Sequence, residues 1–199
     1  MDLSDNLFWR RLHSFMGALP LGFFLVFHLY ENSYGLSGQE VYDGHVQGLR
    51  SLPYLHVLEA AFIYIPLLYH SLYGLYIWYT GKNNFPHYSY ARNGLYTLQR
   101  VTGLTAFVFV WYHIYDQRLL PYPSYYTVFA SLTNTAVLVL YFVGVAAVAL
   151  HLFLGLWNVS VKWGVAIGEK AQRTLLAGFA LAGMGLAFMG LRALTGFMR

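Results

Sequence analysis

The chain has 199 residues, of which 58% are hydrophobic and only 10% are charged, and its formal net charge is +4. Soluble domains carry about 25% charged residues, so this composition excludes an ordinary water-soluble domain and indicates an integral membrane protein. The chain has no cysteine, which excludes thiolate-held iron–sulfur clusters and covalently attached haem.

Five long uncharged runs predict an all-α membrane bundle, because a helix needs about 20 apolar residues to span a bilayer. We expect five transmembrane helices at about 12–32, 56–80, 95–116, 129–159 and 172–195. Pro121 and Pro123 delay the start of the fourth helix. The loops are too short to hold another domain, so we expect residues 1–199 to form a single transmembrane domain.

Basic residues gather before the first helix, between the second and third, and between the fourth and fifth. The opposite two loops carry only Arg50 and Arg118. The positive-inside rule therefore predicts a multi-pass protein with a cytoplasmic N-terminus. Topology and lipid headgroups account for these charges, so we expect membrane lipid and no nucleic acid as a partner.

Four histidines lie inside four different predicted helices and form two pairs by depth. His28 and His113 lie three residues from an acid near the outer surface, whereas His70 and His151 lie deeper and nearer the inner basic residues. Two imidazoles from two helices at one depth can hold one haem iron from both sides. Such an iron has no open position and only transfers electrons. The pattern predicts two b-type haems enclosed by the bundle.

Three alternatives bear on these histidines. A single histidine in a membrane helix often bonds a backbone carbonyl and does no chemistry. Zinc would need several ligands at one level. A haem-free transporter or proton channel would use the histidines as relays, although the predicted helices lack the polar interruptions typical of transporters.

Other residues are candidates for the surroundings of the haems. Gly74 and Gly155, each four residues after an inner histidine, leave room for a porphyrin edge. The candidates for the propionates of the inner haem are cationic or hydroxylic: Arg11, His13, Ser14, Arg100 and Lys162. Arg118 is a candidate at the outer haem. Glu31, Glu59 and Asp116 are either surface acids or proton relays for a quinone, which takes up protons when it is reduced.

Four stretches carry a family resemblance: FWRRLHS at 8–14, LLYHSLYGLY at 67–76, GKNN at 81–84 followed by YSY at 88–90, and LQRVTG at 98–103. They resemble the dihaem cytochrome b anchor of bacterial succinate:menaquinone oxidoreductases, and quinol:fumarate reductases have a similar anchor. The resemblance extends over nearly the whole chain, including the helix count and the four histidines.

The resemblance implies an enzyme subunit of the bacterial cytoplasmic membrane, with the succinate site on a partner chain. The implied partners are a flavoprotein with FAD and an iron–sulfur subunit on the cytoplasmic face. His70 and His151 would hold the proximal haem, and His28 and His113 the distal one, close to menaquinone and Glu59. Electrons would pass from the iron–sulfur subunit through both haems to menaquinone. An anchor of a quinol:fumarate reductase, or of another dehydrogenase such as a hydrogenase or formate dehydrogenase, is the alternative.

Overall fold

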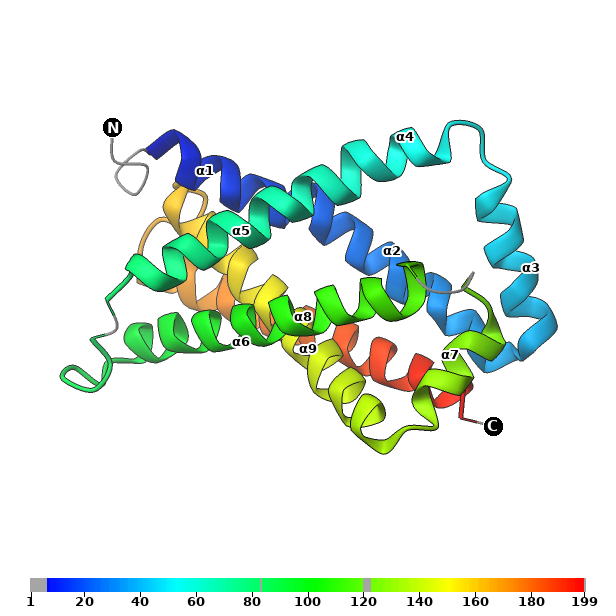
Figure 1. Ribbon diagram of the computed structural model, residues 1–199. Helices are drawn as coiled ribbons and strands as arrows, with labels where there is room; N and C mark the ends of the chain where they lie inside the picture. The colour runs from blue at the N-terminus through cyan, green and yellow to red at the C-terminus, as the bar shows by residue number, and fades with distance from the viewer. Residues whose placement is uncertain (1–6, 83, 120–122, 199) are drawn as a thin grey trace.

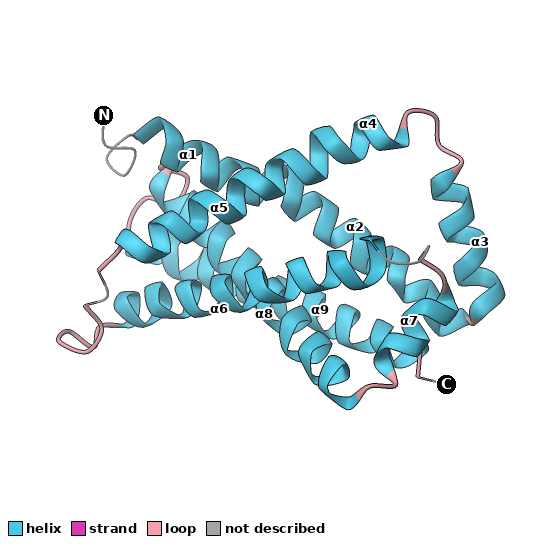
Figure 2. Cartoon of the chain, viewed as in Figure 1, coloured by secondary structure: helices cyan, strands magenta, loops and turns pink. Residues whose placement is uncertain are grey.

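The computed structural model describes residues 7–82, 84–119 and 123–198. Within these ranges every regular element is a helix, and the helices are joined by short loops (Figure 2). The predicted all-α fold is therefore confirmed for the part of the chain that the structure describes. Pro121 lies outside the described residues.

The first long helix is continuous but changes its winding midway. It consists of α1 (Leu7–Met16), the π turn η1 (Gly17–Leu21) and α2 (Gly22–Asn32), and the 3-10 turn η2 (Ser33–Ser37) follows it. Pro20 lies inside η1. Proline has no N–H to donate to the helix ladder, and a π turn is a common way for a helix to absorb such an interruption.

The next two long helices also contain π turns. One consists of α4 (Leu55–Glu59), η3 (Ala60–Tyr64) and α5 (Ile65–Thr80). The other consists of α6 (Ala91–Ile114) and η4 (Tyr115–Leu119). The last long helix is α9 (Glu169–Gly196).

The helix expected at 129–159 is two helices in the structure. A short helix, α7 (Tyr125–Leu132), precedes the long helix α8 (Thr135–Lys162). Asn134 separates them, because its side-chain oxygen accepts a hydrogen bond from the backbone N–H of Ala136 at 2.9 Å and caps α8. A further helix, α3 (Gln39–Arg50), occupies the region between the first two predicted spans, where no helix was expected.

Four stretches are long and apolar enough to cross a membrane: Leu7–Ser37, Leu55–Thr80, Thr135–Lys162 and Glu169–Gly196. The helix α6 has 24 residues but is not among them. Its first turns carry polar side chains, including Arg92, Gln99 and Arg100. Four of the five expected spanning helices are therefore found as candidates by length and composition.

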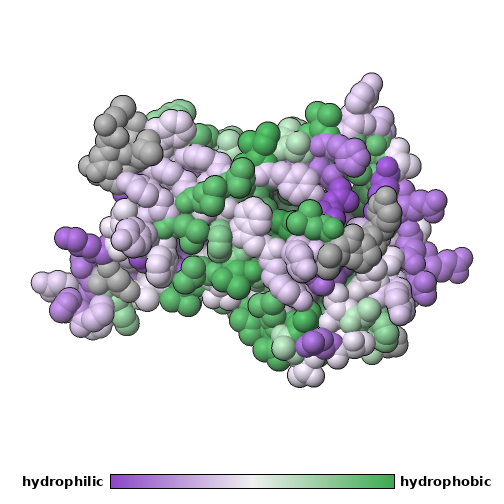
Figure 3. Space-filling view, viewed as in Figure 1, coloured by the Kyte–Doolittle hydropathy of each residue, from purple (hydrophilic) through white to green (hydrophobic). Residues whose placement is uncertain are grey.

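The long helices run back and forth between two ends of the molecule (Figure 1). The inner end, as we name it, holds the start of α1 and the loops that follow α5 and α8. The outer end holds α3, α7 and the C-terminus. Hydrophobic residues gather across the middle of the visible face, and hydrophilic residues gather at its two ends (Figure 3). This distribution suits a protein that spans a lipid bilayer.

Packing is tight at the outer end. Phe197 is buried there, with its ring centre 4.8 Å from that of Tyr42 in α3 and 5.2 Å from that of Tyr125 in α7. The Tyr125 hydroxyl donates to the backbone oxygen of Gly196 at 2.7 Å, and its backbone N–H donates to Asp43. These contacts join α3, α7 and α9 beside the outer pair of histidines.

Candidate functional site

The inner pair of histidines joins α5 to α8. The ring centres of His70 and His151 lie 6.1 Å apart, and the ring planes are inclined by 74°. The helices therefore bring together the two side chains that the sequence pairs by depth.

His70 is seated against the first long helix. Its Nδ1 atom lies 2.9 Å from the backbone oxygen of His13, and a Cβ atom at Gly17, one helical turn further on, would collide with its ring. The ring of His13 stacks on that of His70 with centres 4.2 Å apart and planes 2° from parallel. The bare backbone at Gly17 is therefore what allows the imidazole to approach this helix.

His151 is seated on α6 in the same way. Its Nδ1 atom lies 3.2 Å from the backbone oxygen of Gln99, and a Cβ atom at Gly103 would lie 2.8 Å from its Cε1 atom. A carbonyl oxygen can only accept, so Nδ1 carries the hydrogen in both inner histidines. Their Nε2 atoms are consequently left as the basic nitrogens.

The inner site is thus built twice from the same parts. A carbonyl oxygen and a glycine four residues later receive the imidazole of another helix. Gly74 and Gly155 also play equivalent parts, because Gly74 lies against the side chain of His13 and Gly155 against that of Gln99. The structure therefore uses one arrangement twice, with residues 13–17 and 70–74 matching 99–103 and 151–155.

The outer pair joins α2 to α6. The ring centres of His28 and His113 lie 5.6 Å apart, with planes inclined by 70°. His28 follows Gly17 by eleven residues, whereas His113 follows Gly103 by ten. The π turn η1 lies inside the longer interval and takes up the extra residue. Both histidines consequently reach the same site.

A polar network supports His113. Its Nδ1 atom lies 3.2 Å from the hydroxyl oxygen of Tyr141, and that hydroxyl donates to Oδ2 of Asp116 at 2.8 Å. Asp116 also accepts from the Gln117 amide at 2.8 Å and the Ser131 hydroxyl at 3.0 Å. Since Tyr141 has one proton and donates it to the carboxylate, its oxygen accepts from His113. Nε2 is again the basic nitrogen.

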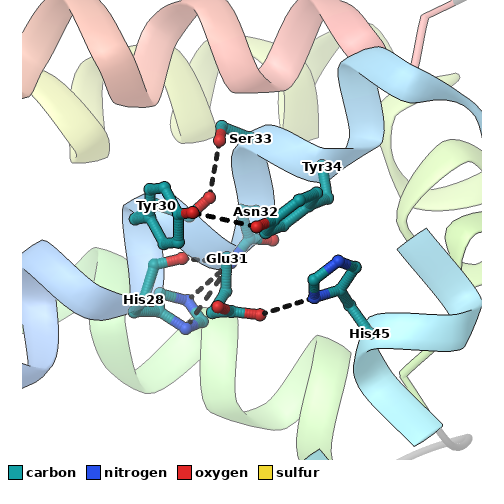
Figure 4. A network of polar contacts seen from close by, with 7 residues as sticks. All are labelled: His28, Tyr30, Glu31, Asn32, Ser33, Tyr34 and His45. Atoms are coloured by element: carbon teal, nitrogen blue, oxygen red, sulfur yellow. Dashed lines mark hydrogen bonds and ion pairs between the residues drawn. The ribbon is translucent and has the colours of Figure 1, made fainter. Parts of the chain in front are cut away.

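His28 has a different surrounding (Figure 4). The amide nitrogen of Asn32 donates to the backbone oxygen of His28 at 2.8 Å and lies 3.4 and 3.5 Å from its ring nitrogens. The hydroxyl of Tyr42 donates to the amide oxygen of Asn32 at 3.4 Å. Burial, and then the nearby charges of Asp43 and Glu31, raise the pKa of Tyr42 to about 12, so Tyr42 keeps its proton at neutral pH.

The three predicted acids have separate partners instead of forming one cluster. Glu31 lies 3.6 Å from His45, which stacks on Tyr34 (Figure 4). Asp116 faces the network behind His113. Glu59, the third acid, is paired with an arginine.

Glu59 accepts a hydrogen bond from the Arg118 guanidinium at 2.6 Å, and Arg118 also donates to the Tyr64 hydroxyl at 3.0 Å. Arg118 lines a cavity of about 510 Å³ together with Arg50 and His56. A carboxylate and a guanidinium from different helices thus form an ion pair beside a cavity at the outer end.

The five predicted propionate contacts lie toward the inner end, and the structure gives several of them other partners. His13 stacks on His70. Ser14 donates to the backbone oxygen of Arg10 in its own helix, and Arg11 is exposed. Arg100 donates to the Tyr96 hydroxyl and to the backbone oxygen of Trp78. Lys162 is the last residue of α8.

Two residues of the site, Gln99 and Tyr141, are not indicated by the sequence patterns considered above. An alignment of residues 13–17 with 99–103 would have pointed to Gln99 as the counterpart of His13. Tyr141 has no such signal, because its contact with His113 depends on how α8 faces α6. Over residues 7–82, 84–119 and 123–198 the structure gathers no group of three or more His, Asp or Glu side chains that could hold a metal ion.

The fold and the site define a class: an all-helical membrane protein in which partly buried histidines of different helices meet in two pairs. Comparison with protein-family models gives no match. The chain is 36% identical over 202 residues to the succinate dehydrogenase cytochrome b558 subunit of Bacillus subtilis (strain 168), a match that covers 100% of both chains. The chain therefore belongs to the family of succinate dehydrogenase cytochrome b subunits, which confirms the predicted family.

Proposed function

We propose that this chain is the membrane anchor and electron-transfer subunit of a bacterial succinate dehydrogenase. In this role it holds two b-type haems and passes electrons from an iron–sulfur subunit on the cytoplasmic side to menaquinone. The flavoprotein subunit with FAD carries the succinate site. The relative's name and the two histidine pairs support this proposal.

The spacing within the histidine pairs is the observation that carries the proposal. Two imidazoles on opposite sides of one metal, each bound at about 2 Å, have ring centres roughly 6 Å apart. The observed separations are 6.1 Å for His70 with His151 and 5.6 Å for His28 with His113. Three of the four histidines also have Nδ1 held by an acceptor, which orients a ligand histidine and leaves Nε2 for the metal.

A haem held by two histidines would supply one-electron transfer. The residues of this chain set where that transfer occurs, because His70 and His151 lie toward the inner end and His28 and His113 toward the outer end. We assign α6 as the fifth spanning helix, since it carries His113 and packs against α8. The basic residues at the inner end support a cytoplasmic N-terminus.

We assign the contacts of the haem propionates to the inner-end group predicted from the sequence: Arg11, His13, Ser14, Arg100 and Lys162. Gly74 and Gly155 have no side chain of their own beside the inner pair, so His13 and Gln99 lie against them, and we assign the same positions to packing of the porphyrin edge. At the outer end, Glu59 is the acid that we assign to protonation of the quinone, because its partner Arg118 lines the 510 Å³ cavity. Glu31 lies beside His45 and does not line this cavity, so we do not assign it to protonation of the quinone.

The test is a reduced-minus-oxidised absorption spectrum and a haem assay on the purified complex. We expect a b-type spectrum and two haems per copy of this chain. A folded, colourless chain would overturn the proposal. Proton or solute transport by such a chain in vesicles would favour the relay alternative. Comparison of succinate oxidation with fumarate reduction by the complex separates the two physiological directions.

A further inference from the structure

We propose that Tyr141 and Asp116 are positioning residues that lower the reduction potential of the outer haem by polarising its ligand His113. The inference rests on the proposed function, because it requires a haem at the outer pair. It assigns Asp116 to a role other than the quinone chemistry considered from the sequence.

The two sites differ in what accepts the Nδ1–H of the ligand. Both inner histidines donate to a neutral backbone carbonyl, at 2.9 Å for His70 and 3.2 Å for His151. His113 instead donates to a hydroxyl oxygen whose own proton goes to a carboxylate. The line from His113 through Tyr141 ends on a negative charge, which neither inner ligand has.

This difference has a direct chemical consequence. An acceptor backed by a carboxylate draws the Nδ1–H toward it and makes Nε2 a stronger donor to the metal. A more basic histidine ligand would stabilise oxidised iron over reduced iron, and hydrogen bonds to the ligands are one of the ways in which proteins set haem potentials. The outer haem is therefore harder to reduce than the same pair of histidines would make it alone.

The network is also held rigidly enough to act on the ring. Tyr141 is 3% exposed, and its ring meets those of Phe109 and His113 edge to face at 5.3 and 5.6 Å. Phe109 in turn fills the space beside Gly144. Asp116 is fixed on its far side by Gln117 and Ser131. The carboxylate is consequently held beside the Tyr141 hydroxyl.

The experiment is a potentiometric titration, followed by absorption and by electron paramagnetic resonance, of the assembled complex. The variants are Asp116→Asn, Tyr141→Phe and the double variant. A His28→Ala chain identifies the outer haem as the component that it loses. We expect each single variant to retain both haems and to raise the outer potential by about 59 mV, equivalent to a tenfold change in the reduction equilibrium. The inner potential stays constant and serves as an internal reference.

The double variant tests whether the two residues act in one line. We expect its shift to match that of Tyr141→Phe, because without the hydroxyl the charge of Asp116 no longer acts on His113 through this line. Ser131→Ala is the matched control, since it removes another hydrogen bond to Asp116 but leaves the one from Tyr141. We expect it to shift the outer potential by less than a third as much.

An unchanged outer potential in either single variant, an equal shift of both haems, or an equal shift in Ser131→Ala would overturn the inference. Loss of the outer haem from both single variants would also overturn it, because it would make the pair necessary for binding instead of tuning. A wild-type complex without haem would instead refute the proposed function. The two failures are therefore distinguishable.

Discussion

The imidazole Nδ1 of His70 lies 2.9 Å from the backbone oxygen of His13, one helical turn before the glycine on which the ring rests. His151 has the same relationship to Gln99 and Gly103. Each inner histidine is therefore fixed by the backbone of another helix. The carbonyl accepts the hydrogen bond from the ring, and the glycine leaves the space that the ring occupies.

We expect Gly103→Ala to displace His151, since the new Cβ would lie 2.8 Å from its Cε1 atom. Overpacking of this kind costs about 1–3 kcal/mol. The inner haem should be lost or weakly bound while the outer haem stays, which a haem assay with a redox titration would reveal. Gly178→Ala in α9 is the control, because nothing lies within 4 Å of the added atom. Equal haem content in the two variants would contradict the proposed seat.

His70→Ala should remove the inner haem and leave the outer one detectable. The haem content should fall from about two per chain to about one, since in the proposed sites each metal is bound through two imidazoles and one imidazole alone would be a weak site. Binding of the soluble partners should weaken as well, which co-purification measures. His56→Ala is the matched control, because that side chain is 92% exposed and should leave both haems in place. A haem content unaffected by His70→Ala would refute the assignment.

Deletion of one residue should be tolerated in η1 but not in α6. Removing Leu19 from the π turn lets the helix return to ordinary α winding, so His28 keeps its direction. Removing Val108 turns His113 by roughly 100° about the axis of α6, because that helix has no π turn between Gly103 and His113. Both side chains are exposed to a similar degree, 57% and 55%.

Haem quantification checks this pair of deletions. The chain without Leu19 should retain two haems, and the chain without Val108 should lose the outer one. The reverse outcome would show that the π turn itself shapes the outer site.

Glu59→Gln should slow quinone reduction by about 100-fold, because a carboxyl group that relays a proton contributes at least that much. The haem spectrum should remain unchanged, because the Glu59 side chain is bonded to Arg118 and not to a histidine of either pair. Turnover with a menaquinone analogue measures the effect. Glu169→Gln breaks another 2.6 Å ion pair, with Arg173 at the inner end, and should leave turnover unchanged. Similar losses in both variants would point to a general effect of charge.

Much of the fold follows from the sequence because lipid imposes a simple requirement on it. Residues that face hydrocarbon must be apolar over about 20 positions, and the uncharged runs mark those positions. Short helices need not meet this requirement, so α3 was not expected and α7 was not expected as a helix separate from α8. The break at Asn134 depends on a cap whose effect is local, and it lies inside an uncharged run.

The meeting of the histidine pairs was predictable for a similar reason. Distance along a helix converts directly into depth, and depth paired His28 with His113 and His70 with His151. Rotation about the helix axis is not encoded so simply. The contact of Tyr141 with His113, and that of His13 with His70, depend on which faces of neighbouring helices meet. Those contacts required the structure.

The carbonyl partners of the inner histidines have an implication for variation in this protein. Every amino acid contributes a main-chain oxygen, so replacing His13 or Gln99 does not abolish the hydrogen bond to the ring, and the two halves of the molecule already use different residues there. At the outer end the acceptor is the side-chain hydroxyl of Tyr141, which one amino-acid substitution can remove. Substitutions would therefore alter the electronic character of one end of the bundle far more readily than that of the other.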